Sequence, residues 1–284
     1  METKIIDGKK LRNEILEKVK QEVTLLSFTP VFCDVLVGED KVSAQYVAMK
    51  GRTAESVGIK FHNAHFASDI ETGELVAELK KLNEVENMCG IIVQLPLPKH
   101  IDKAQVFEAI NPLLDVDCLG AKASEKFYNG DTSIGFPTAL SCMVLLDSIN
   151  IDLNPSTSLG ASKKIVVLGQ GMLVGRPVTA LLRFRNLSPI TVDINTLNKE
   201  DIIKDADIII SATGQGQYLT GEMIKSGAVI IDAGTSESNG SIVGDVNLES
   251  VKGVASYVSP VPGGVGPVTV AMLLKNVLTV AKKK

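Results

Sequence analysis

Alternating runs of apolar and polar positions predict that helices and strands follow one another along the first hundred residues. Apolar residues at helical spacing indicate helices, and short apolar runs indicate strands. The predicted elements are a helix over 11–23, a strand over 31–37, a helix over 42–57, a strand over 59–66, a helix over 71–82 and a strand over 90–95. Gly58 and Pro96 stand where a helix and a strand should end. Strands that alternate with helices predict a parallel sheet covered on both faces.

A second pattern begins at residue 165. The apolar run 165–168 leads into the glycine-rich turn 169–175, GQGMLVG, and a helical pattern begins at Arg176. Such a strand, turn and helix can hold the pyrophosphate of a dinucleotide, because glycines let backbone N–H groups approach it and the helix N-terminus adds a positive dipole. The spacing is one residue longer than the usual fingerprint, so the turn alone leaves a glycine turn without ligand as an alternative. Further strands are predicted over 191–193, 207–211 and 228–232, and they supply the context that a dinucleotide site needs.

These patterns predict an α/β protein of two domains. Residues 154–162, rich in Pro, Ser, Thr and Gly, are the best candidate linker, and the final segment 269–283 is an amphipathic helix. We expect an N-terminal parallel-sheet α/β domain over 1–140 together with 267–284, and a Rossmann-type dinucleotide-binding domain over 141–266. The C-terminal helix is expected to pack back on the first domain.

Composition narrows the class of protein. The 284 residues are 45% hydrophobic and 22% charged with a net charge of −4, which argues against binding nucleic acid or a membrane surface. No N-terminal apolar segment and no apolar run of membrane-spanning length are seen, so a cytoplasmic protein is predicted. Four widely spaced cysteines without a C-x-x-C pair favour buried free thiols over a zinc site or disulfides, and we expect no metal.

Tyr46 and Lys50 are the first candidates for chemistry. They are four residues apart on a predicted helix and so project from one face, with Ser43 one turn earlier. A lysine partly desolvated beside a phenol loses some of its preference for the charged form and can hold or move a proton at neutral pH. The alternative is a surface lysine beside a half-buried tyrosine, which this pair alone leaves open.

Two further polar positions follow buried segments. Gln94 lies at the carboxyl end of an apolar strand, where open α/β sheets place ligand contacts. Asp115 and Asp117 follow a helix and a proline turn, and either could be a ligand contact or a helix-capping or turn aspartate. Residues 260–267, PVPGGVGP, form a rigid loop with few side chains that suits close contact with a flat ligand.

Together these segments resemble the methylenetetrahydrofolate dehydrogenase/methenyltetrahydrofolate cyclohydrolase family over essentially the whole chain. The segments that carry the resemblance are Val37-Gly38 with Ser43, Tyr46 and Lys50; 90–98, GIIVQLPLP; 115–117, DVD; 175–177, GRP; 212–214, ATG; and 260–267, PVPGGVGP. The resemblance implies a bifunctional enzyme that oxidises 5,10-methylenetetrahydrofolate with a nicotinamide cofactor and hydrolyses the methenyl product to 10-formyltetrahydrofolate. It also implies a small-molecule folate substrate and a homodimer.

The resemblance assigns roles to individual residues. Lys50 is expected to be the catalytic lysine, Tyr46 to stack on or hydrogen-bond the pterin side, Gln94 to interact with the lysine and Asp117 to bind the pterin ring. Pro262 and Gly263 are also expected to contact substrate. The expected cofactor-binding residues are Gly169, Gln170, Gly171, Gly175, Asp193, Ile194 and Thr235.

Some positions depart from the family pattern. Cys118 stands where most relatives have glycine after Asp-Val-Asp, and 136–139, FPTA, replaces Pro-Cys-Thr-Pro. Both changes could reshape the pocket wall near Asp117. They leave open a monofunctional dehydrogenase, and a catalytically silent folate- or nucleotide-binding protein is the alternative from another class.

The cofactor-binding region also departs from the family pattern, and its changes favour NAD over NADP. Gln170, Asp193 and Ile194 replace residues that commonly contact the 2′-phosphate of NADP, the family's more usual cofactor. Asp193 lies 18 residues after Gly175, near the place where an acid binds the ribose of NAD, roughly 20 residues on. We expect NAD to be used at least as well as NADP. The alternative is a solvated Asp193, with the phosphate bound by Arg183 or Arg185.

Overall fold

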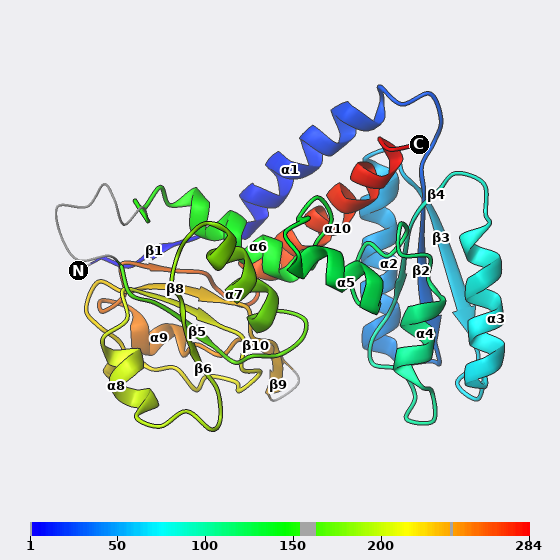
Figure 1. Ribbon diagram of the computed structural model, residues 1–284. Helices are drawn as coiled ribbons and strands as arrows, with labels where there is room; N and C mark the ends of the chain where they lie inside the picture. Colours follow the sequence, from blue (N-terminus) through cyan, green and yellow to red (C-terminus); the bar gives the residue numbers. More distant parts are fainter. Residues whose placement is uncertain (1, 154–162, 239–240) are drawn as a thin grey trace. The chain divides into compact units, whose positions relative to one another are not determined.

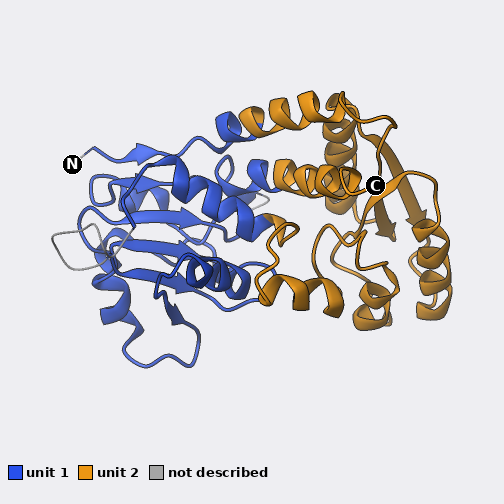
Figure 2. Ribbon diagram, turned by 45° about the horizontal axis from the view of Figure 1, so that its top comes forward, with its two compact units in different colours: residues 1–12, 138–269 blue, residues 13–137, 270–284 orange. Residues whose placement is uncertain are grey.

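The computed structural model describes residues 2–153, 163–238 and 241–284, and it divides into two compact units. Unit 1 comprises residues 1–12 and 138–269, and unit 2 comprises residues 13–137 and 270–284 (Figure 2). The candidate linker 154–162 lies outside the described residues. Both units are α/β, as the sequence predicts.

Unit 2 is built on a three-stranded parallel sheet in the order β3-β2-β4. Its strands are β2 (Val31–Val37), β3 (Lys60–Phe66) and β4 (Met88–Val93), and its helices are α1 (Gly8–Val23, whose first residues belong to unit 1), α2 (Lys41–Ser56), α3 (Thr72–Asn83), α4 (Lys103–Ala109) and α5 (Ala121–Tyr128). The central strand β2 is buried at every position because it has a neighbouring strand on each side and is covered on both faces. Figure 1 shows α2 and α3 beside this sheet.

The C-terminal helix α10 (Val265–Ala281) completes the core of unit 2, as expected from the sequence. Leu273, Leu274, Val277 and Leu278 join the apolar cluster around β2 and β4. Asn276 is buried on the same helix, and its Nδ2 donates to the carbonyl oxygens of Val116 at 2.9 Å and Gly135 at 2.7 Å. The helix therefore fixes the backbone on both sides of the Asp117 segment.

Unit 1 contains a six-stranded parallel sheet in the order β1-β11-β8-β7-β5-β6. Its strands are β1 (Lys4–Ile5), β5 (Ile165–Leu168), β6 (Ile190–Val192), β7 (Ile208–Ser211), β8 (Val229–Asp232) and β11 (Tyr257–Val258), beside the hairpin β9 (Ser236–Ser238) and β10 (Ser241–Val243). The helices are α6 (Pro137–Ser148), α7 (Gly175–Phe184), α8 (Lys199–Lys204), α9 (Leu248–Val251) and the short η1 (Gly221–Met223). The chain runs from β5 to β6 on one side and then to β7 on the other, which makes the carboxyl ends of β5 and β7 a topological switch point.

Residues 1–12 group with unit 1, whereas the sequence analysis placed them with the first domain. The reason is β1, because Lys4 and Ile5 pair with Tyr257 and Val258 of β11. A strand of two residues is too short to show an alternating sequence pattern, so β1 becomes recognisable only through its pairing with β11.

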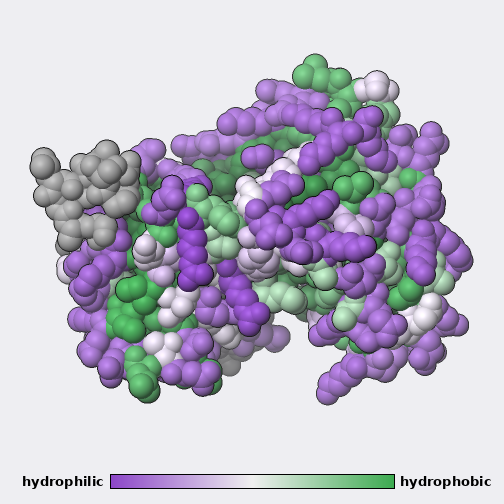
Figure 3. Space-filling model, in the orientation of Figure 1, coloured by the Kyte–Doolittle hydropathy of each residue, from purple (hydrophilic) through white to green (hydrophobic). Residues whose placement is uncertain are grey.

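Hydrophilic side chains cover most of the surface visible in Figure 3, with small apolar areas between them. Within the described part of the chain, no helix is long and apolar enough to cross a membrane. The same residues contain no group of three or more His, Cys, Asp or Glu side chains that could hold a metal ion.

Candidate active site

Lys50 is buried at the centre of a polar cluster in unit 2. Its side chain is 3% exposed, and Nζ lies 2.6 Å from Oδ2 of Asp34 and donates to Oε1 of Gln94 at 2.8 Å. Asp40 caps the N-terminus of α2, because its carboxylate accepts from the Ser43 N–H. Gly51 follows Lys50 and packs against the Phe61 ring, where a Cβ would collide, so the helix lies close to the sheet. The lysine is therefore an interior group and not a surface one.

Asp34 is the functional candidate that the sequence analysis missed. It lies in the middle of β2, is completely buried, and desolvation raises its pKa while the Lys50 charge opposes that rise. The segment VFCDVLV is apolar apart from this one charge, so its pattern predicts a strand and contains no motif that singles out Asp34. A carboxylate inside a fully buried strand is costly without a partner, and that was the available signal.

Gln94 follows β4 directly, as predicted, and the structure brings it to Lys50. Its amide oxygen accepts from Lys50, and its Nε2 donates to the Leu95 carbonyl oxygen at 2.5 Å. Both ends of the amide are thus bonded, which fixes the oxygen toward the lysine. Gln94 lies at the carboxyl edge of the unit 2 sheet, where a residue that follows a parallel strand is expected to contact a ligand.

Tyr46 lies one turn before Lys50 on α2. The centre of its ring is 4.9 Å from Lys50 Nζ, within the range of a cation–π contact. The residue is 37% exposed, so one part of it remains accessible while its ring faces the ammonium. Desolvation of the phenol, with smaller contributions from the charges of Asp117 and Asp34, raises the pKa of Tyr46 to about 12.

Asp115 and Asp117 are adjacent in sequence but perform different tasks. The carboxylate of Asp115 accepts from the N–H groups of Cys118 at 2.8 Å and Gly120 at 2.7 Å, so Asp115 is the turn aspartate. Asp117 is half-buried, and desolvation followed by the Asp115 charge raises its pKa to about 7, against the lowering influence of Lys50. Asp117 therefore interacts electrostatically with Lys50, and its carboxyl group changes charge near neutral pH.

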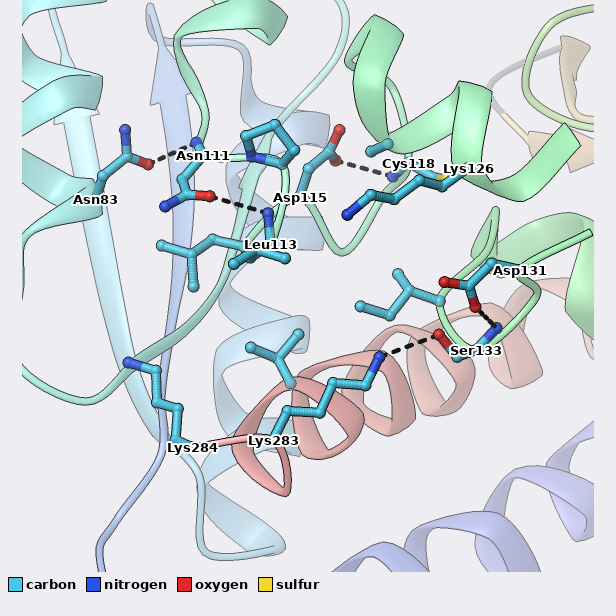
Figure 4. Close-up of a pocket in the computed structure, with 15 residues that line it drawn as sticks. Asn83, Asn111, Leu113, Asp115, Cys118, Lys126, Asp131, Ser133, Lys283 and Lys284 are labelled. Atoms are coloured by element: carbon cyan, nitrogen blue, oxygen red, sulfur yellow. Dashed lines mark hydrogen bonds between the residues drawn. The ribbon is translucent and has the colours of Figure 1, made fainter. Parts of the chain in front are cut away.

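Cys118 occupies a backbone conformation that glycine adopts easily, with φ of +64°. The hydrogen bond from its N–H to Asp115 holds that conformation, as Figure 4 shows. Phe136, the other departure noted in the sequence, is buried and packs its ring 5.1 Å from that of Phe127. Both unusual residues are accommodated by local packing in unit 2.

A cavity of about 240 Å³ lies beside the Asp115 turn. Figure 4 shows Asp115 and Cys118 on its wall, with Lys126 and Lys283 from α5 and the end of the chain. Lys283 donates to the Ser133 hydroxyl at 3.2 Å. None of Lys50, Tyr46 and Gln94 lines this cavity, so it is separate from the lysine cluster.

In unit 1 the glycine turn follows β5 at the topological switch point. Gly169 has φ of +82°, and a Cβ there would collide with the Ala212 carbonyl oxygen at the end of β7. A Cβ on Gly175 would collide with the Gly169 carbonyl oxygen, whereas one on Gly171 would meet open space. Two glycines thus shape the turn, and the third leaves room above it for a ligand.

The other expected cofactor residues follow the carboxyl ends of β5, β6 and β8 in unit 1. Gln170 is bound back onto the turn, because its Nε2 donates to the Gly169 carbonyl oxygen at 3.0 Å. Asp193 follows β6, and its Oδ1 accepts from the Asn195 N–H at 2.9 Å and the Thr196 hydroxyl at 3.1 Å. Ile194 is 86% exposed, and Thr235, after β8, is exposed as well.

The loop 260–264 also belongs to unit 1. The Gly264 N–H donates to the Pro260 carbonyl oxygen at 2.7 Å, and Gly263 has φ of +113°, so the loop is closed by its own backbone. Pro262 and Gly263 are therefore held in a fixed conformation. A contact of these two residues with substrate stays a prediction.

Two family models match the chain. The tetrahydrofolate dehydrogenase/cyclohydrolase catalytic domain matches residues 6–117, and the NAD(P)-binding domain of the same family matches residues 137–284. The bifunctional protein FolD of Hydrogenobaculum sp. (strain Y04AAS1) is 41% identical over 285 residues, which cover 99% of each chain.

Solved structures give the same result. The bifunctional enzyme FolD from Campylobacter jejuni has a TM-score of 0.92 and 35% identity over 99% of each chain. FolD from Trypanosoma brucei, crystallised with NADP cofactor and an inhibitor, has a TM-score of 0.92 and 35% identity over 100% of this chain and 98% of its own. The residues matched span both units, and the chain belongs to the tetrahydrofolate dehydrogenase/cyclohydrolase family.

Proposed function

We propose that this protein is a bifunctional enzyme of tetrahydrofolate one-carbon metabolism. It oxidises 5,10-methylenetetrahydrofolate to 5,10-methenyltetrahydrofolate with a nicotinamide cofactor, and it hydrolyses that product to 10-formyltetrahydrofolate. The observation that carries the proposal is the buried amine of Lys50, bonded to Gln94 and paired with Asp34, in a chain that matches both domains of the family. A protein that only binds folate has little use for such a group.

Unit 1 fits a dinucleotide at its carboxyl edge. A bound nicotinamide cofactor supplies the hydride acceptor for oxidation of the methylene bridge. The N–H groups of the turn 169–175 and the N-terminus of α7 would hold its pyrophosphate, because the space at Gly171 is open where a side chain would intrude. Asp193, Ile194 and Thr235 would border the remainder of the cofactor.

Lys50 would serve the hydrolytic step. Water adds to the methenyl carbon and releases one proton, and the resulting carbinolamine then loses its C–N5 bond as the formyl group forms on N10. The Lys50 ammonium donates a proton to N5 as that bond breaks, and the proton of the carbinol hydroxyl restores the lysine. Gln94 holds the amine, Tyr46 and Asp117 bind the pterin, and Pro262 and Gly263 contact the substrate.

Replacement of Lys50 tests this assignment. Lys50→Met keeps the length of the side chain but removes the donor, so we expect decay of methenyl absorbance and formation of 10-formyl product to fall to background. Folate binding should stay within a few-fold of the native value. Lys41→Met, an exposed lysine at the start of the same helix, is the matched control. Unchanged hydrolysis by Lys50→Met would remove the mechanism, and native protein without formyl product would favour a monofunctional dehydrogenase.

We also propose that NAD is used at least as well as NADP. A carboxylate at Asp193 repels a 2′-phosphate by about 1 to several kcal/mol at partly screened contact distance. The alternative needs an arginine for the phosphate, yet Arg185 is occupied by both carboxylate oxygens of Asp147, at 2.5 and 2.8 Å. Arg183 is then the arginine left for that role.

The ratio of kcat/KM for the two cofactors decides the matter. We expect a ratio near or above one in favour of NAD, and Asp193→Ser should raise kcat/KM for NADP about tenfold by removing about 1.4 kcal/mol of repulsion. Serine keeps a hydroxyl that can accept in the turn. Arg183→Ala should leave the ratio unchanged. A hundredfold preference of the native enzyme for NADP would overturn the proposal.

Two further properties complete the proposal. The four cysteines are free and buried, which suits a reducing compartment such as the cytoplasm. The family resemblance favours a homodimer, and light scattering across a concentration series would measure the mass of the particle.

A further inference from the structure

We propose that Asp34 is a positioning residue for the folate reactions: its carboxylate holds the Lys50 ammonium in place and keeps it charged, so that Lys50 acts as a proton donor. This inference rests on the role of Lys50 in the proposed function. It adds a residue of β2 to the site and excludes a neutral Lys50 acting as a general base on water.

The sheet of unit 2 determines why the two groups meet. Successive residues of a strand point to opposite faces, so Asp34 shares a face with Phe32 and not with Cys33. Asp34 is paired in register with Ile92 of β4, and Gln94 lies two residues further along that same face. The helix α2 covers this face, as the packing of Gly51 on Phe61 requires. Lys50 therefore lies over the centre of the sheet, between Asp34 and Gln94.

Asp34 has one partner. Nζ of Lys50 lies 2.6 Å from its Oδ2, and the side chains are 3% and 0% exposed. Apart from the Lys50 ammonium, no N–H or O–H donor among the residues that the structure describes bonds either oxygen of Asp34. A buried carboxylate with no backbone donors has no evident structural task other than facing the ammonium. Asp115 provides the contrast, because its carboxylate is satisfied by the backbone of its own turn.

Counting donors assigns the remaining hydrogen of Lys50. An ammonium carries three N–H groups. Oε1 of Gln94 accepts one N–H at 2.8 Å, and a second N–H is directed toward the carboxylate of Asp34 in the ion pair. One N–H is left for a substrate atom. Two acceptors fixed at the amine favour its charged form, because each interacts better with an N–H donor than with a lone pair.

The pair also suits the oxidation step. Loss of a hydride converts the neutral methylene bridge into a methenyl cation, and an uncompensated ammonium nearby would oppose that change. The carboxylate of Asp34 makes the buried pair neutral overall. The other titratable groups that interact with Lys50 are Tyr46 on its own helix and Asp117 on the turn before α5, and the charge of Asp115 acts on Asp117.

Asp34→Asn tests the inference, because asparagine keeps the shape and removes the charge. The readout is kcat for methenyltetrahydrofolate hydrolysis between pH 6 and 9, corrected for spontaneous hydrolysis. We expect the loss of activity at high pH to begin at least one pH unit lower than in the native enzyme. Activity should fall about tenfold at pH 8 and recover partly at pH 6, with KM for the folate within threefold. Methylene oxidation should slow as well.

Cys33→Ala is the matched control, since Cys33 is the neighbouring buried residue of β2 on the opposite face. It should reduce thermal stability without moving the pH profile. An Asp34→Asn enzyme whose kcat falls equally at every pH would show a structural role only and would overturn the inference.

A measurement on native protein covers the case in which Asp34→Asn does not fold. The ¹⁵N shift of the Lys50 Nζ should report a charged amine from pH 6 to 9, and a neutral amine at pH 7.5 would overturn the inference. The two proposals fail separately. Hydrolysis retained by Lys50→Met removes the proposed function, whereas loss in Lys50→Met with an unmoved profile in Asp34→Asn removes only the role of Asp34.

Discussion

The two carboxylates near Lys50, those of Asp34 and Asp117, differ in the surroundings that set their charge. Asp34 is completely buried and faces one cation, whereas Asp117 is half-buried and faces both a cation and a second carboxylate. Desolvation raises the pKa of both groups, and that of Asp117 reaches about 7, where ordinary changes of pH alter its charge. The state of Asp117 should therefore govern how folate binds.

Folate affinity is expected to rise with pH through about 7 in the free enzyme. A pKa raised to about 7 leaves Asp117 protonated below that pH, and the ionised form is the better acceptor for the N–H donors of a pterin. The dissociation constant of a non-reacting folate analogue should fall several-fold between pH 6 and 8. Titration by fluorescence measures it, and Asp117→Asn should abolish the dependence. The exposed Asp131→Asn should keep it, and a native dissociation constant independent of pH would contradict the assignment.

The sequence supplied most of this cluster because its members follow elementary spacing rules. Tyr46 and Lys50 are one helical turn apart, and Gln94 ends a strand, so each had a local signal. Asp34 had only the weak signal of one charge within a strand that was otherwise apolar. Its partner is 16 residues further along the chain, and no short-range pattern connects the two.

The decisive element in unit 1 is the turn between β5 and α7. Its glycines are not equivalent, because Gly169 and Gly175 fit against backbone while Gly171 faces open space. Within these seven residues, Gly169 and Gly175 are therefore required for folding, and Gly171 is required for binding. Substitutions at the two kinds of position should affect stability and cofactor binding separately.

Gly171→Ala should fold normally and bind cofactor poorly. The added methyl group meets no protein atom but enters the space assigned to the pyrophosphate, so KM for the cofactor should rise at least tenfold. Gly175→Ala should instead lower the melting temperature by several degrees, since its methyl group collides with the Gly169 carbonyl oxygen. Gly73→Ala, at an open position on α3, is the control for both measurements. Normal cofactor binding by Gly171→Ala would refute the site.

Elements that carry an apolar period or an apolar run were predictable, and elements with neither were not. The bounds of β2 and β5 match the apolar runs of the sequence, and α2 differs from its predicted range by one residue at each end. The two-residue strands β1 and β11, and the hairpin β9–β10, carry too few positions to establish a period. The helices α5 and α6 were also not predicted. The hydrophobic positions of α6 are spread around the helix.

At the scale of the whole molecule, buried carboxylates couple stability to pH. Asp232 is 1% exposed, and burial raises its pKa to about 6, although three backbone N–H groups donate to it. A carboxyl group whose pKa is higher when folded binds its proton more tightly in the folded state. Its contribution is therefore fully present below about pH 4 and is lost as pH rises to about 6.

Asp232→Asn should consequently destabilise the protein most at low pH. Asparagine resembles the protonated acid and does not ionise. The native protein loses about 3 kcal/mol of stability as Asp232 ionises, for a pKa shift from 3.8 to about 6, and the variant does not. The difference in free energy of unfolding between native and variant should shrink by up to that amount between pH 4 and 7. Urea denaturation at each pH measures it, with exposed Asp69→Asn as control. A difference that grows with pH would show that the sign is wrong.

The path of the chain through the two units has a consequence for synthesis. Unit 2 contains Lys50 near the start of the protein, yet residues 270–284 supply part of its core. The ribosome has therefore synthesised the residues before 270 by the time this core can close. A nascent chain stopped before residue 270 should expose the apolar faces that α10 covers, which makes the last helix the step that commits the enzyme to its native state.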